Sequence, residues 1–182
     1  DLHYPLRRQR QMCIRDRGTD ILADGQVAGY MEETGFFDTK WTVSIDGNTW
    51  FYAKFVTDEP INENTDTLVS ATTYGFYDAD DTCIGYAQEQ AVKGGSGGYY
   101  ICYMDADGNP KDYYSNEEAT QTYDSEGNLI ATGTVDFNGF FESQHCYVEI
   151  TAQEGSTMQM DFMDKMAMYL YLFSDFNSEH LD

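Results

Sequence analysis

Several acidic turns carry the oxygen-bearing residues that hard cations prefer. The richest of them, residues 105–112, reads Asp-Ala-Asp-Gly-Asn-Pro-Lys-Asp. A calcium-binding EF-hand loop starting at Asp105 would need glycine at its sixth position and glutamate at its twelfth, but these residues are Pro110 and Asn116. The acidic segments 78–81 and 124–126 fit the pattern no better. Because Asp, Asn and Gly also shape hairpin turns, we interpret all three segments as turns and predict no metal and no cofactor.

Nucleophilic catalysis has few candidate residues. After residue 17 the only histidines are His145 and His180, and His180 lies in a polar tail. Cys146 directly follows His145, but neighbours in a strand face opposite sides of a sheet, so the two cannot act as a couple by adjacency. The sequence contains no nucleophile elbow and no metalloprotease helix motif. We predict no catalytic residue and leave enzymatic activity open, with a noncatalytic role preferred.

Glycoside hydrolysis needs only two carboxylates at a suitable separation. The chain has 32 Asp and Glu residues, so their number does not single out a pair. Asp136, Glu142 and Glu149 lie in or near predicted strands, where an antiparallel sheet more often turns such residues to water. A carboxylate-pair hydrolase acting on a polysaccharide therefore remains an alternative function.

Aromatic side chains that border turns are the stronger functional signal. Flat aromatic faces with a polar tip suit contact with sugar rings and with partner proteins. The alternative is structural, because adjacent aromatics in one strand alternate between the interior and the rim. We predict six ligand-binding residues, which are Trp41, Trp50, Tyr99, Tyr100, Tyr113 and Tyr114.

Short antiparallel strands must position these side chains. Tyr, Phe, Trp, Thr and Val favour strands, and here they recur in short runs separated by Asp, Gly and Asn clusters, which is typical of an all-β domain. Asp46-Gly47 has the residues of a tight hairpin turn. Consecutive hairpins are predicted from strands at 41–45, 49–56, 67–77, 82–87, 99–104, 111–114, 120–123, 129–135 and 144–152.

Two segments are harder to assign. Residues 158–173 follow Ser156 and include Gln159, which are spaced as a helix capping box. Their polar residues would fall around most of a helix circumference, however, which a surface helix avoids. A hairpin turning at Asp164-Lys165 is preferred, and the helix stays open. Residues 20–34 are weakly patterned, and we expect only a short helix or a loop there.

Charge is distributed unevenly along the chain. All five arginines lie in the first 17 residues, whereas five lysines and 30 acidic residues from Gly18 onward give that part a charge of −25. A nucleic-acid binder needs a basic surface, and anionic membranes attract basic segments, so the acidic part is predicted to bind neither. No apolar run in the sequence is long enough for a transmembrane segment.

The basic head carries a resemblance of its own. Met12-Cys13-Ile14-Arg15-Asp16-Arg17 resembles a translated transposase mosaic-end sequencing adapter, whose bases read ATG TGT ATA AGA GAC AG. The resemblance implies that residues 1–17 are a non-native, adapter-derived segment in a metagenomic assembly. The true N-terminus and any signal peptide would then lie outside the sequence.

Without that segment three cysteines remain, Cys83, Cys102 and Cys146. An odd number cannot form a closed disulfide framework, and their spacings contain no Cys-x-x-Cys motif. Free cysteine is among the most buried residue types. We predict small buried side chains, with one disulfide pair left open.

One further segment has a family likeness. Residues 123–141 contain YDSEGNLIATG and then Asn138-Gly139-Phe140-Phe141, and they resemble one hairpin repeat of choline- and glucan-binding cell-wall proteins. The resemblance implies noncovalent attachment to a cell-wall polymer or glucan. The segment has one extra residue before Thr132-Gly133 and lacks the repeat's tryptophan, and the acidic hairpins do not recur at the fixed period that a solenoid requires.

Together these patterns predict an all-β fold, a single antiparallel sandwich or meander barrel built from consecutive hairpins. We expect residues 18–34 to be a weakly structured lead-in, 35–173 the β domain and 174–182 a polar tail. The predicted function is a noncatalytic extracellular or cell-surface domain that binds a carbohydrate or a protein partner. The alternatives are the carboxylate-pair hydrolase and a structural spacer within a larger surface protein.

Overall fold

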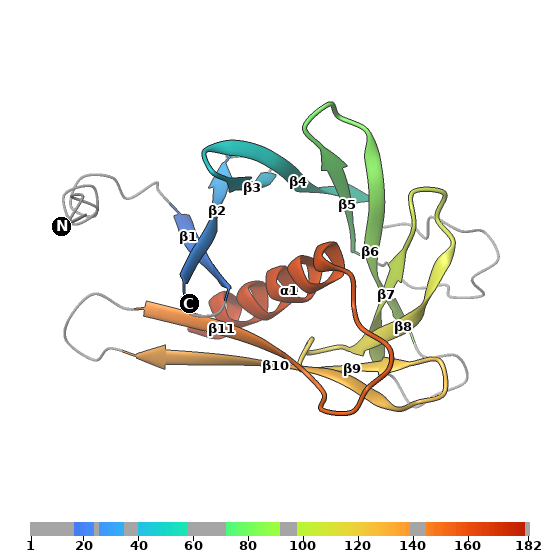
Figure 1. Ribbon diagram of the computed structural model, residues 1–182. Coiled ribbons are helices and arrows are strands. Elements are labelled where there is room, and N and C mark those ends of the chain that lie inside the picture. Colours follow the sequence, from blue (N-terminus) through green and yellow to red (C-terminus); the bar gives the residue numbers. More distant parts are fainter. Residues whose placement is uncertain are drawn as a thin grey trace. The chain divides into compact units, whose positions relative to one another are not determined.

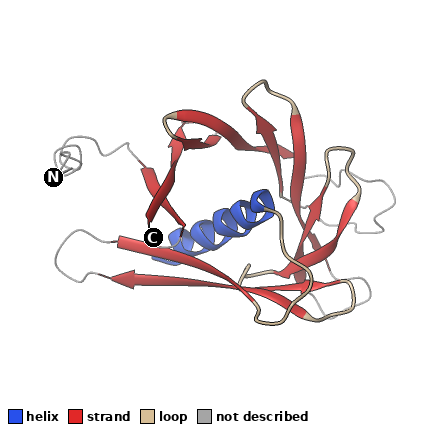
Figure 2. Ribbon diagram, in the orientation of Figure 1, coloured by secondary structure: helices blue, strands red, loops and turns tan. Residues whose placement is uncertain are grey.

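Strands make up most of the residues that the structure describes (Figures 1 and 2). The computed structural model describes residues 17–23, 26–34, 40–57, 72–91, 98–138 and 145–180. The strands follow one another in chain order in the sheet. The all-β class and the meander of consecutive hairpins are therefore confirmed.

The chain divides into two compact units. The first unit ends at Lys54 and also includes residues 77–82, whereas the second contains residues 55–76 and everything from Cys83 onward. The first unit holds the strands β1 (Arg17–Ala23), β2 (Gln26–Thr34), β3 (Lys40–Ile45) and most of β4 (Asn48–Thr57). Within this unit β1 pairs antiparallel with β2, β2 with β3, and β3 with β4.

The first unit has one buried face and one tight turn that the sequence predicted. Met31, Val43 and Phe51 pack on the buried face, each at most 4% exposed. Asp46 and Gly47 have positive φ angles of 50° and 77°, as a two-residue hairpin turn requires.

The short helix or loop expected at residues 20–34 is wrong. β1 and β2 form a hairpin whose register runs from Arg17 opposite Glu33 to Ala23 opposite Gln26. Cross-strand pairing supports residues whose own pattern is weak, because strand preference depends largely on the neighbouring strand.

The second unit is a meander with a helix packed against it. It takes residues 73–76 of β5 (Thr73–Asp78). The strands predicted between residues 82 and 152 are all present, although those at 83–91, 110–116 and 129–138 are longer than expected. Residues 67–71 of the predicted 67–77 strand lie outside the described residues. The strands are β6 (Cys83–Ala91), β7 (Tyr99–Met104), β8 (Pro110–Asn116), β9 (Gln121–Asp124), β10 (Leu129–Asn138) and β11 (His145–Ala152).

The hairpin preferred for residues 158–173 is wrong, because α1 (Phe162–His180) occupies most of this segment. The helix packs on β10 and β11 (Figure 1) and buries Met166, Met168 and Leu172. Asp164 was one of the polar residues that disfavoured a helix, because they would fall around most of its circumference. In the structure Asp164 is buried, with Lys111 as its partner. A long-range ion pair thus allows a polar residue on the inner face of α1. The helix also includes residues 174–180 of the expected polar tail.

The helix comes close to β10 at Gly133. A Cβ atom on this residue would lie 2.6 Å from Leu172 Cδ1, 2.8 Å from Met168 Cε and 3.0 Å from the carbonyl oxygen of Ala119. Glycine in a strand commonly marks such a close approach, and here it sets the distance between the helix and the sheet.

Candidate functional site

Three tyrosines lie side by side on neighbouring strands of the second unit. Tyr100 is on β7, Tyr114 on β8 and Tyr123 on β9, and Tyr114 pairs directly with Tyr123. The ring centroids of Tyr100 and Tyr114 are 5.7 Å apart at an interplanar angle of 79°, and those of Tyr114 and Tyr123 are 5.8 Å apart at 31°. Aromatic rings at this spacing are in contact. We call these three residues the tyrosine platform.

The tyrosine platform is on the face of the sheet that points away from α1. Ser115 and Thr122 pair across β8 and β9 and are fully buried. Their hydroxyls are 2.6 Å apart, and Thr122 Oγ1 donates to Met168 Sδ of α1 at 3.4 Å. Because side chains alternate along a strand, Tyr114 and Tyr123 must point outward. Tyr114 is 36% exposed, so its ring is open to a ligand.

Hydrogen bonds hold the hydroxyls at both ends of the platform. Tyr123 OH donates to Gln121 Oε1 of the same strand at 2.6 Å, and Tyr100 OH donates to Gln90 Oε1 of β6 at 2.7 Å. Gln90 in turn donates to the buried Gln88 at 2.9 Å. Burial raises the pKa of Tyr100, so its phenol keeps the proton that it donates. Rings fixed in this way lose less entropy when a ligand binds.

The platform contains two of the six predicted binding residues, Tyr100 and Tyr114. Their sequence neighbours Tyr99 and Tyr113 point to the other side of the same strands, as alternation requires. Trp41 and Trp50 belong to the first unit. Trp50 is 43% exposed there, and its ring meets the edge of Phe51 at a centroid distance of 5.5 Å.

Sequence reasoning missed Tyr123, although a signal for it was present. The connection between β8 and β9 is centred on Glu118 and Ala119, and Ala119 has the positive φ of 54° that a turn residue often takes. Counting outward from that centre places Tyr114 opposite Tyr123. The count needs the turn position, which no Gly or Pro marks in this hairpin.

On the helix side of the sheet, Lys111 of β8 anchors the beginning of α1. Its Nζ lies 2.7 Å from Asp164 Oδ2 and 2.9 Å from Asp161 Oδ2. Tyr113, only 8% exposed, donates its hydroxyl proton to Asp164 and accepts the backbone N–H of Asp161 at 3.2 Å. Tyr113 therefore serves the interior of the second unit rather than an open aromatic face.

In this anchor, formed by Lys111, Tyr113, Asp161 and Asp164, charge and burial shift the pKa values in opposite directions. Burial raises the pKa of the Asp164 carboxyl, although Lys111 and Tyr113 pull it down. Burial by itself lowers the pKa of Lys111, but hydrogen bonds and charge from Asp164 and Asp161 outweigh it, so that pKa is raised overall. The ammonium group is thus retained at neutral pH. An acidic side chain in the first turn also suits the positive end of the helix dipole.

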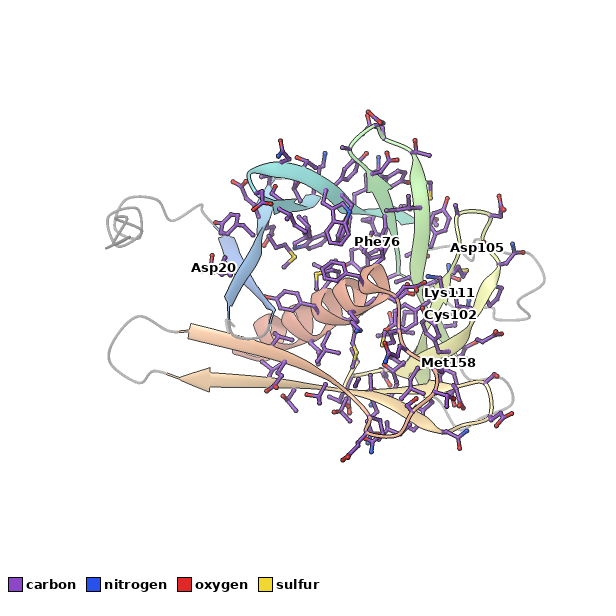
Figure 3. The ribbon with its side chains drawn as sticks, in the orientation of Figure 1. Asp20, Phe76, Cys102, Asp105, Lys111 and Met158 are labelled. Carbon is purple, nitrogen blue, oxygen red and sulfur yellow. The ribbon has the colours of Figure 1, made fainter. Side chains whose placement is uncertain are left out.

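A shallow hollow of about 380 Å³ lies beside the anchor, lined by Lys111, Tyr113, Met158 and Asp161 among others (Figure 3 labels Lys111 and Met158). Asp161 and Asp164 form a carboxylate pair here, the feature that a hydrolase needs. Asp164 is only 5% exposed, however, and its Oδ2 already contacts both Lys111 and Tyr113. The pair therefore holds the helix to the sheet.

The acidic turns use their carboxylates internally. Asp105 Oδ1 accepts the backbone N–H groups of Asp107 and Asn109 at 3.0 Å and 2.9 Å, and Asp124 and Asp78 each accept two in the same pattern. Hydrogen bonds from the turn lower the pKa values of Asp105 and Asp124. Their interpretation as turns is confirmed, and the described residues contain no group of three His, Cys, Asp or Glu that could hold a metal ion.

The remaining candidates for chemistry contribute little that can be described. Cys83 and Cys102 are free thiols, and burial raises the pKa of Cys102 to about 11. Glu142 and the side chains of His145 and Cys146 lie outside the described residues. Among the helices of the described part, none is long and apolar enough to cross a membrane.

The first unit contains a cluster of two lysines and two tyrosines. Lys40 and Lys54 are directly opposite each other on β3 and β4. Lys40 Nζ is 3.5 Å from the ring centroid of Tyr52, Lys54 Nζ is 4.7 Å from that of Tyr77, and the two rings stack at 5.2 Å. Cation–π contacts offset the repulsion between the lysines. Burial, and a 2.7 Å hydrogen bond donated to Asp81, raise the pKa of Tyr52 to about 12.

No family model, curated protein or solved structure matches the chain. The tyrosine platform is therefore the feature of the molecule that points to a function.

Proposed function

We propose that the protein is a noncatalytic extracellular or cell-surface domain that binds carbohydrate through the tyrosine platform. The supporting observation is that Tyr100, Tyr114 and Tyr123 share one outward face, with ring centroids 5.7 Å and 5.8 Å apart. Sugar rings have apolar C–H faces that pack on aromatic rings, while their hydroxyls bond to polar groups nearby. The platform offers the aromatic part of that arrangement already in place.

The charge of the domain supports a neutral carbohydrate. From Gly18 onward the chain carries a charge of −25, which repels an anionic polymer over about 10 Å at 0.1 M salt. Strong acidity also keeps a domain soluble and suits a secreted or surface location. We therefore expect neutral plant or cell-wall polysaccharides to bind better than acidic ones.

Stacking holds a sugar but supplies neither a proton donor nor a nucleophile. The carboxylate pair of Asp161 and Asp164 is on the helix side of the sheet, where Lys111 engages both members. Two carboxylates on the far side of the sheet cannot flank a bond in a ligand lying on the platform. The proposed function is therefore binding without hydrolysis.

Depletion of the purified full chain from solution by insoluble cellulose, xylan and chitin tests the proposal. Tyr114→Ala and Tyr123→Ala should each weaken binding roughly two- to tenfold, because one aromatic contact is worth about 0.5–1.5 kcal/mol. The matched control is Tyr30→Ala, which removes a tyrosine of similar exposure, 39%, from β2 of the first unit. Thermal unfolding of each variant checks that it folds.

Three results would contradict the proposal. Binding to none of the polysaccharides would remove the ligand class, and equal loss in Tyr30→Ala would remove the platform as its location. Release of reducing sugar from a bound polymer would instead support the hydrolase.

A further inference from the structure

A row of polar residues runs beside the tyrosine platform on the same outward face. Tyr100 is opposite Asn116 on β8, and Asn116 Oδ1 accepts the backbone N–H of Gln121 on β9 at 2.8 Å. Gln121 is opposite Thr132 on β10, which is opposite Thr151 on β11. We call Asn116, Gln121, Thr132 and Thr151 the polar row.

The inward neighbours of the polar row establish its direction. Gly133 follows Thr132 and lies against the side chains of α1, and Thr122 follows Gln121 and donates to Met168 of the helix. Alternation then turns Thr132 and Gln121 outward. Gln121 and Thr151 are exposed, and Thr132 is half-buried.

The polar row has hydrogen-bonding groups to spare. Among the described residues, the hydroxyls of Thr132 and Thr151 and the side-chain nitrogen of Gln121 have no hydrogen-bond partner. Asn116 differs, because its amide is used inside its own hairpin, where Nδ2 donates to Thr120 at 2.8 Å. The free groups thus lie on β9, β10 and β11, where they continue the line that the tyrosines begin on β7.

We infer that the ligand is the interior of an extended neutral polysaccharide chain that crosses the strands from β7 to β11. This inference rests on the proposed function and specifies its ligand. Sugar rings at one end would pack on the tyrosines, and hydroxyls of the following rings would bond to Gln121, Thr132 and Thr151. At about 4.8 Å per strand step, five strands span roughly 19 Å, a length that several linked sugar rings fill and a single sugar does not.

The shape and charge of this face favour a chain interior over a chain end. Recognition of an end or a small ligand usually needs a concave pocket that encloses it, whereas Tyr114, Gln121 and Thr151 are exposed on a strand face. Glu149 on β11 is exposed on the same face, since it is opposite Thr134, two residues beyond Thr132. Glu149 would repel a polysaccharide that carries carboxylates, so the bound polysaccharide should be uncharged.

The test is calorimetric titration of the full chain with cello-oligosaccharides from the disaccharide to the hexasaccharide. Affinity should rise with length until the row is filled. The double variant Thr132→Val/Thr151→Val keeps the shape of both side chains but removes both hydroxyls. It should bind the hexasaccharide roughly three- to tenfold more weakly than the unmodified chain, while the disaccharide, which reaches only the tyrosines, should bind as before. Thr49→Val, an exposed threonine on β4 of the first unit, is the matched control.

The outcomes separate this inference from the proposed function. If affinity rises with length and the double variant loses that gain, the chain crosses the polar row. If the disaccharide and the hexasaccharide bind equally, or the double variant binds the hexasaccharide like Thr49→Val, the crossing chain is wrong and carbohydrate binding on the tyrosines still stands. If neither these oligosaccharides nor the insoluble polysaccharides bind, the proposed function itself fails.

Discussion

Replacing Lys111 with methionine should show how firmly the anchor holds α1 to the sheet. Methionine preserves the length and the apolar stem of the side chain but removes the ammonium that lies 2.7 Å from Asp164 and 2.9 Å from Asp161. Asp164 would then remain buried with Tyr113 as its hydrogen-bond donor. The perturbation is therefore an uncompensated carboxylate inside the second unit.

The expected loss of stability is about 2 kcal/mol at neutral pH. Breaking a fully buried ion pair costs about 3–5 kcal/mol. The Lys111 side chain is 21% exposed and that of Asp164 is 7% exposed, so water screens part of the interaction and the estimate is reduced. Lys165→Met is the matched control, because Lys165 lies in the same helix turn as Asp164 and forms no ion pair with a described residue.

The stability loss in Lys111→Met should depend on pH, because Asp164 can be protonated. Burial already raises the pKa of Asp164, and removal of Lys111 should raise it further. A raised carboxyl pKa in the folded state favours the protonated form, so its contribution to stability is present at low pH and is lost as the pH rises through the raised value. The penalty in Lys111→Met should therefore shrink as the pH is lowered from neutral into the mildly acidic range.

Urea unfolding followed by far-ultraviolet circular dichroism measures the free energy of unfolding of each variant at neutral and at mildly acidic pH. A double-mutant cycle with Asp164→Asn isolates the ion pair. The stability losses of the two single variants, added together, should exceed the stability loss of the double variant. If Lys111→Met is as stable as Lys165→Met, or if its loss of stability is the same at neutral and acidic pH, the ion pair does not hold α1 to the sheet.

Two further predictions concern the helix contact and the first unit. Gly133→Ala should lower the free energy of unfolding by about 1–3 kcal/mol through overpacking, and with it the melting temperature. The reason is that the new Cβ would lie 2.6 Å from Leu172 Cδ1 and 3.0 Å from a carbonyl oxygen. An unchanged melting temperature would mean that α1 packs less closely on β10. Tyr52 should titrate at about 12 by ultraviolet absorbance, against an ordinary tyrosine pKa of 10.0. The stability that its environment contributes should be complete below pH 10.0 and be lost as the pH rises toward 12. Asp81→Asn should lower the titration midpoint, and a midpoint of 10.0 in the unmodified chain would contradict the buried, hydrogen-bonded position of Tyr52.

Local chemistry made the hairpins predictable from the sequence. A turn such as Asp46-Gly47 is specified by residues that tolerate positive φ, and at Asp105 the carboxylate binds backbone N–H groups of its own turn. These interactions join residues only a few positions apart, so a single sequence contains all of their partners. The all-β class and the meander followed from them.

The helix was not predictable in this way, because its decisive partner is distant. Asp164 is stabilised on the inner face of α1 by Lys111, which is 53 residues away in the chain. Likewise β1 and β2 depend on cross-strand pairing rather than on a strong pattern of their own. Pattern rules weigh each residue by its neighbours in sequence, and they misjudge a residue whose partner comes from another element.

The candidate site likewise has features that the sequence predicts and features that depend on contacts between distant strands. The order of the residues is enough to place aromatic side chains beside the turns and to put Tyr113 and Tyr114 on opposite faces of one strand. Which aromatic rings meet depends on strand pairing, because the register between strands brings Tyr123 beside Tyr114 and places the polar row beside both. A shift of one residue in register would turn the same side chains to the opposite face, so the platform is a property of the folded sheet.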